Sequence, residues 1–149
     1  MTPELQPAFN QAWVGVVSGP LSAPVLGRVV GMLAARADCP IDRLDDALLV
    51  ADAVAAKAGT FSDDGRVRAQ VVARVGCIEL RVGPLREGGA DSLIQSTALP
   101  GVGNVLEQVA DELEPQQADG VEDAEYLIIR LDFDAQRPPT IDRMESDVT

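Results

Sequence analysis

Histidine is absent from this chain of 149 residues, and aromatic residues make up only 3% of it. Without histidine, catalysis by a serine–histidine or cysteine–histidine pair is excluded. The two cysteines, Cys39 and Cys77, lack the spacing of a metal-binding set, and we expect free, at least half-buried thiols in a reducing cytoplasm. With so few aromatic residues, the core has to be built from valine, leucine, isoleucine and alanine.

Positive charge is scarce, because 12 lysines and arginines face 24 aspartates and glutamates, a net charge of -12. Binding to nucleic acid phosphates needs clustered basic residues, so we expect no nucleic acid partner. The excess acid indicates either a well-solvated surface or a docking surface for a basic partner. No apolar run approaches the roughly 20 residues that span a bilayer, and the start MTPELQPAFNQ is unlike a secretion signal. We expect a cytoplasmic protein with no membrane partner.

Alternation of polar and apolar residues predicts the strands. The alternation is clearest over residues 66–75. Arg66, Arg68 and Arg74 are expected on a solvent-exposed face, and the valines and alanines between them on a buried face. Gly76 is expected to turn the chain into a returning strand that Gly83-Pro84 stops. Further strands are predicted at residues 12–18 and 125–133. The arginine row is either the solvated side of the sheet or a contact for an acidic partner or a second copy.

Apolar residues at helical spacing predict two long helices, at residues 22–37 and 41–58, with Ser22 as the N-cap of the first. In the first helix, the apolar stripe is expected to contain Met32. A short helix is expected after Glu87-Gly88-Gly89, and a longer one over residues 99–114, followed by a polar loop over residues 115–125. This order of elements predicts an α+β two-layer sandwich with a mixed, mostly antiparallel sheet. Residues 12–134 would form a single domain between a flexible N-terminus (1–11) and a disordered tail (135–149).

Two local patterns carry a resemblance to a known family. They are VADAVAAKA at residues 50–58 and LPGVGNVLEQVADELE at residues 99–114, in the predicted second and last helices. With the order of elements from residue 13 to 133, the chain resembles the GHKL ATP-binding fold, and within it the anti-sigma-factor serine/threonine kinases of bacterial partner-switching systems. The resemblance implies a sheet covered on one face by helices, with a pocket for ATP and magnesium.

The resemblance assigns the first pattern to the family's catalytic helix. There, a glutamate positions or activates the attacking hydroxyl, and an asparagine four residues later holds magnesium. The matching positions here are Asp52, which is one methylene shorter and remains a candidate base, and Ala56. Since Mg²⁺ requires oxygen ligands, Ala56 cannot hold it. The alternative for Asp52 is a structural residue that faces solvent or caps a neighbouring loop.

The resemblance also places glycines around the nucleotide. Gly83 stands where the family has the acid that recognises adenine, and Gly88 and Gly89 are either a displaced version of that motif or a plain loop. Gly101 and Gly103 match the glycines beside the phosphates. They form either a nest for an anion or a tight turn with close backbone approach. Together with Asp52 and Ala56, these five glycines make up a vestigial nucleotide pocket.

Three functions follow as hypotheses. The first is a non-catalytic regulatory module that binds a protein, such as a sigma factor or an antagonist-like domain. It would need no metal and no cofactor, with ATP and Mg²⁺ relevant only to a working pocket. The second is an active ATP-dependent serine/threonine kinase with Asp52 as base. The third is a self-associating domain, a homodimer with Trp13 and Val17 of the first strand at its seam.

Overall fold

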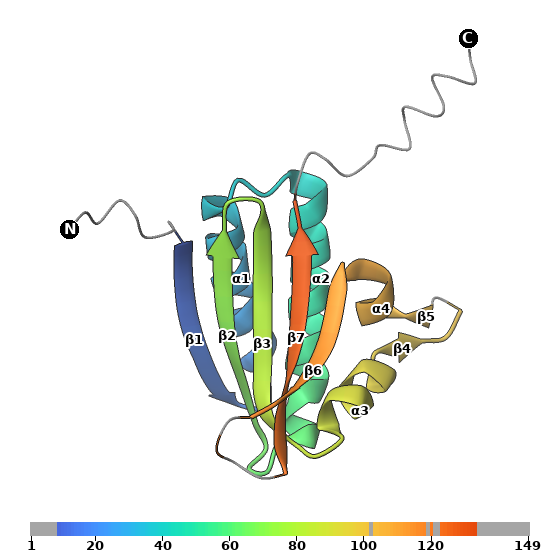
Figure 1. Ribbon diagram of the computed structural model, residues 1–149. Coiled ribbons are helices and arrows are strands. Elements are labelled where there is room, and N and C mark those ends of the chain that lie inside the picture. Colours follow the sequence, from blue (N-terminus) through green and yellow to red (C-terminus); the bar gives the residue numbers. More distant parts are fainter. Residues whose placement is uncertain (1–8, 102, 119, 121–122, 134–149) are drawn as a thin grey trace, which may run out of the picture.

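The computed structural model describes residues 9–101, 103–118, 120 and 123–133, which form two layers (Figure 1). One layer is a five-stranded sheet with the order β1-β2-β3-β7-β6, in which every neighbouring pair is antiparallel. The helices lie on one face of it. The predicted fold class, an α+β two-layer sandwich, is confirmed. The strands of the sheet are β1 (Phe9–Val17), β2 (Arg66–Arg74), β3 (Cys77–Arg86), β6 (Glu112–Gln117) and β7 (Ala124–Asp132).

Two long helices, α1 (Ser22–Arg36) and α2 (Ile41–Lys57), cover the sheet, and α2 continues into the 3-10 turn η2 (Ala58–Phe61). Beside them lies a group of short elements that follows β3. It consists of α3 (Gly89–Ser96), the small hairpin of β4 (Ala98–Leu99) and β5 (Gly103–Asn104), and α4 (Val105–Val109).

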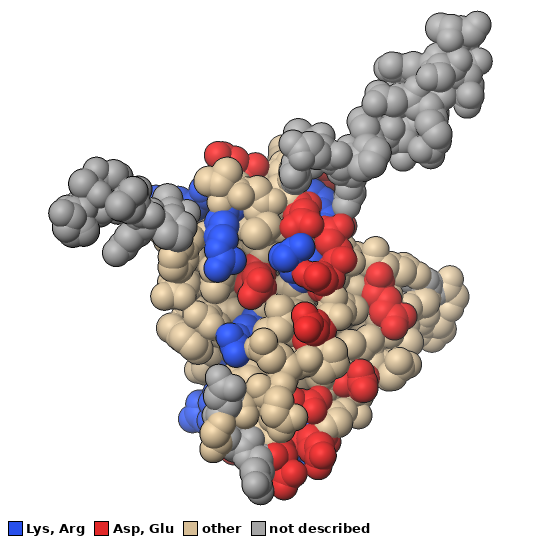
Figure 2. Space-filling view, viewed as in Figure 1, with Lys and Arg blue, Asp and Glu red and all other residues tan. Residues whose placement is uncertain are grey.

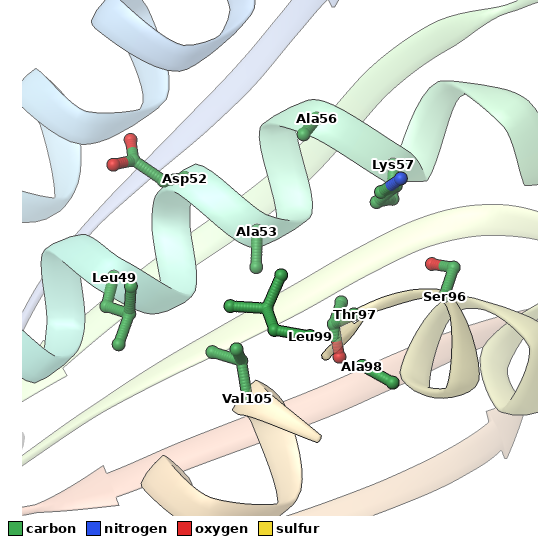
Figure 3. A pocket seen from close by; sticks show the side chains of 10 residues that line it. All are labelled: Leu49, Asp52, Ala53, Ala56, Lys57, Ser96, Thr97, Ala98, Leu99 and Val105. Carbon is green, nitrogen blue, oxygen red and sulfur yellow. The ribbon is translucent and has the colours of Figure 1, made fainter. Parts of the chain in front are cut away.

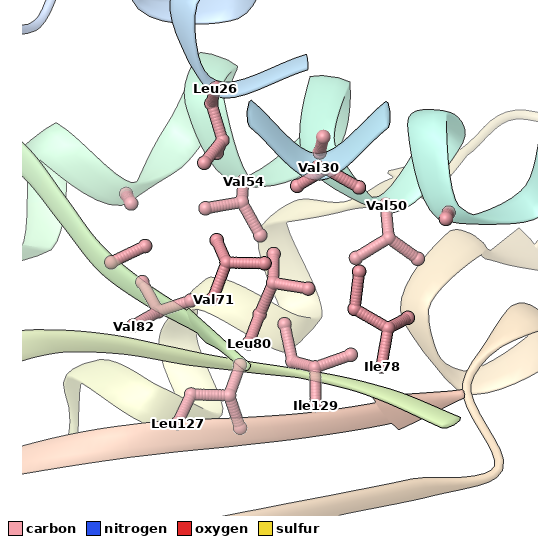
Figure 4. Packing of buried hydrophobic residues seen from close by; sticks show 14 of the residues in the cluster. Leu26, Val30, Val50, Val54, Val71, Ile78, Leu80, Val82, Leu127 and Ile129 are labelled. Atoms are coloured by element: carbon pink, nitrogen blue, oxygen red, sulfur yellow. The ribbon is translucent and has the colours of Figure 1, made fainter. Parts of the chain in front are cut away.

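The core lies between the buried face of the sheet and the two long helices (Figure 4). Apart from Phe133, the buried members of this core are aliphatic, as the shortage of aromatic residues requires. Removing these side chains from water is the main favourable contribution to folding. Fully buried members include Leu26, Val30, Val50, Val54, Ile78, Leu80, Leu127 and Ile129.

The first long helix is offset by one residue from the prediction. Ser22 is its first helical residue rather than its N-cap, and the Ser22 hydroxyl donates to the carbonyl oxygen of Gly19 at 2.7 Å. The buried stripe contains Leu26 and Val30, whereas Met32 is 58% exposed. The predicted second helix and the hairpin at Gly76 agree with the structure.

The sheet does not stop at Gly83-Pro84, contrary to the prediction. β3 runs on to Arg86, and its register with β7 shifts between Val82 and Leu85. Such an irregularity accommodates a proline, which has no N–H to donate to the ladder. Gly83 has a φ of 141°, and a Cβ there would come within 2.9 Å of the carbonyl oxygen of Glu125. Glycine is therefore required by close packing within the sheet.

The predicted helix over residues 99–114 is wrong. Of the described residues in this segment, only Val105–Val109 is α-helical, and Glu112–Gln117 forms the edge strand β6 within what was expected to be the helix end and a polar loop. One carboxylate oxygen of Asp111 accepts from the Arg43 guanidinium at 2.6 Å and from the Asp132 N–H at 2.7 Å. These contacts with α2 and β7 direct the chain onto the sheet instead of along a helix axis.

The first strand begins at Phe9, so residues 9–11 of the predicted flexible N-terminus belong to β1. Residues 1–8, Val102 and the tail 135–149, which was predicted to be disordered, lie outside the described residues.

Candidate functional site

A pocket of about 260 Å³ lies between α2 and the segment that joins α3 to α4 (Figure 3). It contains the two positions that the resemblance assigned to the catalytic helix, Asp52 and Ala56. The residues that line it are Leu49, Asp52, Ala53, Ala56 and Lys57 from α2, with Ser96, Thr97, Ala98, Leu99 and Val105 from the opposite wall.

Helical periodicity explains the α2 wall. Val50 and Val54 point into the core, so Leu49, Ala53 and Ala56 fall on the outward side of the same helix. Figure 3 shows Leu49 and Ala53 facing Leu99 and Val105, which makes the centre of the pocket aliphatic.

Charge is confined to the margins of the pocket. The carboxylate of Asp52 is directed away from Leu99 and Val105, and Lys57 lies at the other end of the lining (Figure 3). Both residues are exposed to solvent. The pocket thus has an apolar centre and, at its rim, one negatively charged and one positively charged side chain.

The opposite wall is held together by hydrogen bonds within the chain. The Thr97 hydroxyl and the Asn104 amide both donate to the carbonyl oxygen of Ile94, each at 2.7 Å. The side-chain oxygen of Asn104 accepts from the Glu107 N–H at 3.1 Å and thereby caps α4. These hydrogen bonds stabilise the wall, and they already engage the polar groups of Thr97 and Asn104 within the chain.

The five glycines of the predicted nucleotide pocket do not line this pocket. Gly101 and Gly103 lie in the exposed β4–β5 hairpin with φ values of 77° and 99°, and a Cβ at Gly103 would meet the Gln108 side chain at 2.6 Å. The positive φ at both positions suits a tight turn, and the atoms nearest to Gly103 belong to a side chain, not to the backbone of another element. Gly83 is buried in β3.

Gly88 and Gly89 mark the N-terminus of α3, where a carboxylate of the same chain is bound. Glu125 on β7 accepts from the N–H of Gly88 at 3.2 Å and of Ala90 at 2.8 Å. An acid at this end of a helix complements the helix dipole and the free N–H groups. The N–H groups at the N-terminus of α3 therefore already bind an anionic group, the Glu125 carboxylate.

The residues present do not fit magnesium-bound ATP. Ala56 offers a methyl group where an oxygen ligand is needed, and Asp52 is the one carboxylate among the residues that line the pocket. In the described part of the chain, no group of three or more acidic, cysteine or histidine residues could hold a metal ion. Gly83 and Pro84, which the resemblance placed at the adenine-reading acid, lie within β3 and carry no carboxylate.

Among the described residues, clear pKa shifts occur at two other places in the fold, at Cys39 and at the Asp64–Arg68 pair. Burial raises the pKa of the Cys39 thiol to about 11, so this thiol remains protonated at neutral pH. The side-chain hydrogen bond from Arg68 lowers the pKa of Asp64 to about 2. Both are explained by local structure, one by the end of α1 and the other by the turn before β2.

The face of the sheet away from the helices carries the predicted arginine row. Figure 2 shows most of the basic side chains over the β1–β3 side of this face and most of the acidic ones towards β6 and β7, where Arg130 pairs with Glu112 and Asp132. Arg68 pairs with Asp64, and the Arg81 guanidinium lies 4.9 Å from the ring centre of Tyr126. The row thus lies on the exposed side of the sheet, where either solvent or an acidic partner could meet it.

Sequence reasoning missed the two leucines at the pocket. Leu49 is 44% exposed and Leu99 is 49% exposed, and they come from opposite walls. The signal for Leu49 was its spacing to Ala53 and Ala56, which forms a second apolar stripe beside the core-facing one. Leu99 had no such signal, because it lies in a two-residue strand within a segment predicted to be helical.

No protein-family model matches this sequence, and no curated protein is significantly similar to it. In the described residues, no helix has the length and apolar character needed to cross a bilayer.

Proposed function

We propose that this chain is a non-catalytic regulatory module that binds a protein partner in a bacterial partner-switching system, on a GHKL-like scaffold and in the cytoplasm. One observation carries the proposal. The wall of the pocket presents Asp52 and, one helical turn later, only the methyl group of Ala56, opposite an aliphatic surface. The surface around Asp52 and Ala56 is concave, but it lacks the groups that would bind magnesium and adenine.

The loss of nucleotide contacts would weaken ATP binding strongly. A hydrogen bond to a charged group contributes about 1.5–3 kcal/mol. Losing both the metal contact and the adenine contact therefore costs about 3 kcal/mol or more, which is about a hundredfold or more in affinity.

The lining favours a protein as the ligand. Exposed leucines on both walls, Leu49 and Leu99, flank a concave aliphatic surface of the kind that takes an anchoring side chain from a partner. The charges of Asp52 and Lys57 at the rim supply orientation. A sigma factor or an antagonist-like domain is proposed as partner by analogy with the family that the chain resembles.

The test begins with capture of the partner from the host bacterium and its production as a pure protein. Its affinity is then measured for the wild-type chain and for Leu99→Asp, which places a charge at the apolar mouth. We expect binding at least about tenfold weaker. Met32→Asp, at an exposed position of α1 outside the pocket, is the matched control and should bind like wild type. Equal affinities for all three proteins would refute a role for the pocket.

A further inference from the structure

The two edges of the sheet differ in their protection against pairing with another strand. Natural proteins protect edge strands with charges, prolines or short length. The β6 edge has six residues, two of them glutamates, and a proline at position 115. The β1 edge has nine residues, FNQAWVGVV, without a charged residue or a proline. Within the described chain, β1 pairs on one side only, with β2.

The backbone groups on the free side of β1 can be assigned from the pairing with β2. The Ser18 N–H donates to the carbonyl oxygen of Gly65, and Val17 lies opposite Arg66 in an unbroken register. Because hydrogen-bonding direction alternates along an antiparallel strand, the odd-numbered residues from Val17 back to Phe9 direct their N–H and C=O away from β2. Residues 9, 11, 13, 15 and 17 are therefore available to a further strand.

The side chains of these residues lie on the face away from the helices, and three of them are large and apolar. Trp13 is 72% exposed, Val17 is 65% exposed and Phe9 is 41% exposed, whereas Val14 faces the core. Exposed aromatic and β-branched residues at alternate positions are the pairs that stabilise neighbouring strands.

We propose that β1 pairs in antiparallel fashion with β1 of a second copy of this chain, about a two-fold axis at Trp13. Phe9 and Val17 are equally spaced from Trp13, four residues on either side. In this register Trp13 lies opposite Trp13 of the second copy, and Phe9 opposite Val17. Each exposed apolar side chain thus gains an apolar neighbour, and the two sheets become continuous.

The sequence of β1 explains why a second copy is the occupant. The apolar residues repeat symmetrically about the strand centre, which suits an interface made of the same surface twice. Each chain carries a net charge of -12, but β1 contributes no charged side chain, so no like charges meet directly across the seam. The inference does not depend on the proposed partner or on the pocket.

Sedimentation velocity of the full chain over a range of concentrations is the first test. We expect a species of twice the 15.7 kDa chain mass. Trp13→Lys places two like charges directly opposite each other and should weaken the dimer at least about tenfold. Val75→Lys introduces the same side chain at another exposed position and should leave the dimer intact. Thermal unfolding of each variant checks that the fold is kept.

Disulfide trapping tests the register in a Cys39→Ser, Cys77→Ser background. Residues directly opposite each other in a hydrogen-bonded pair have Cα atoms about 5.5 Å apart, within disulfide range. Trp13→Cys should therefore cross-link two chains under oxidation. Val17→Cys should not, because its thiols would lie about 27 Å apart along the strands. The proposal is overturned by a monomer at all concentrations, by a dimer that tolerates Trp13→Lys, or by Val17→Cys chains cross-linking as readily as Trp13→Cys chains.

Discussion

Asp111 joins three elements, so its removal should destabilise the fold measurably. Its carboxylate accepts from the Arg43 guanidinium at 2.6 Å and from the Asp132 N–H at 2.7 Å. The Arg43 side chain is 11% exposed, so it is largely shielded from water, whereas Asp111 is 28% exposed. Breaking a buried ion pair costs about 3–5 kcal/mol, and partial exposure reduces this figure. In a variant without the Asp111 carboxylate, Arg43 would still have its ion pair with Asp46, whose atoms are 2.7 Å apart, and this reduces the cost further.

We therefore expect Asp111→Ala to lower the free energy of unfolding by about 2–3 kcal/mol. Asp111→Asn should lose less, since its amide oxygen still accepts from the Asp132 N–H. Urea unfolding followed by circular dichroism measures both. Glu114→Ala, at an exposed position of the strand β6 that follows Asp111, is the control and should stay within about 0.5 kcal/mol of wild type. A loss below about 0.5 kcal/mol for Asp111→Ala would refute the role given to this contact.

Three further predictions follow from single contacts. Glu125→Ala removes the carboxylate at the start of α3 and should cost about 1 kcal/mol in urea unfolding; no loss would contradict the capping role. In a Cys77→Ser variant at pH 8, Cys39 should react with iodoacetamide about a hundredfold more slowly than after unfolding, because burial raises its pKa from 9.0 to about 11. In an NMR titration, Arg68→Ala should return the pKa of Asp64 from about 2 towards 3.8. Since the folded pKa is the lower one, this pair stabilises the fold above pH 3.8 and loses that effect as the pH falls towards 2.

The sequence predicts elements whose pattern is set locally. The α2 helix and the hairpin at Gly76 follow from apolar spacing and from a turn residue, and both agree with the structure. The segment after Asn104 shows the limit of this reasoning. Leu106, Val109 and Leu113 have helical spacing, but Leu113 lies in β6, because pairing with β7 outweighs local preference there.

The candidate site was predictable only in part for the same reason. Asp52 and Ala56 share one helix, so their spacing alone places both beside one pocket. The glycines near residues 83, 88 and 101 lie on separate elements, and their distance from that helix depends on tertiary packing. The Gly88 position shows this most clearly, because its anion partner, Glu125, is 37 residues away in the sequence.

Calorimetric titration of the chain with magnesium and ATP tests the central claim most directly. If Ala56 and Gly83 stand where the proposed family scaffold needs an oxygen ligand and an adenine-reading acid, we expect no saturable heat at ATP concentrations up to about 1 mM. Binding in the micromolar range that requires magnesium and disappears in Asp52→Ala would contradict the account and favour the ATP-dependent kinase instead.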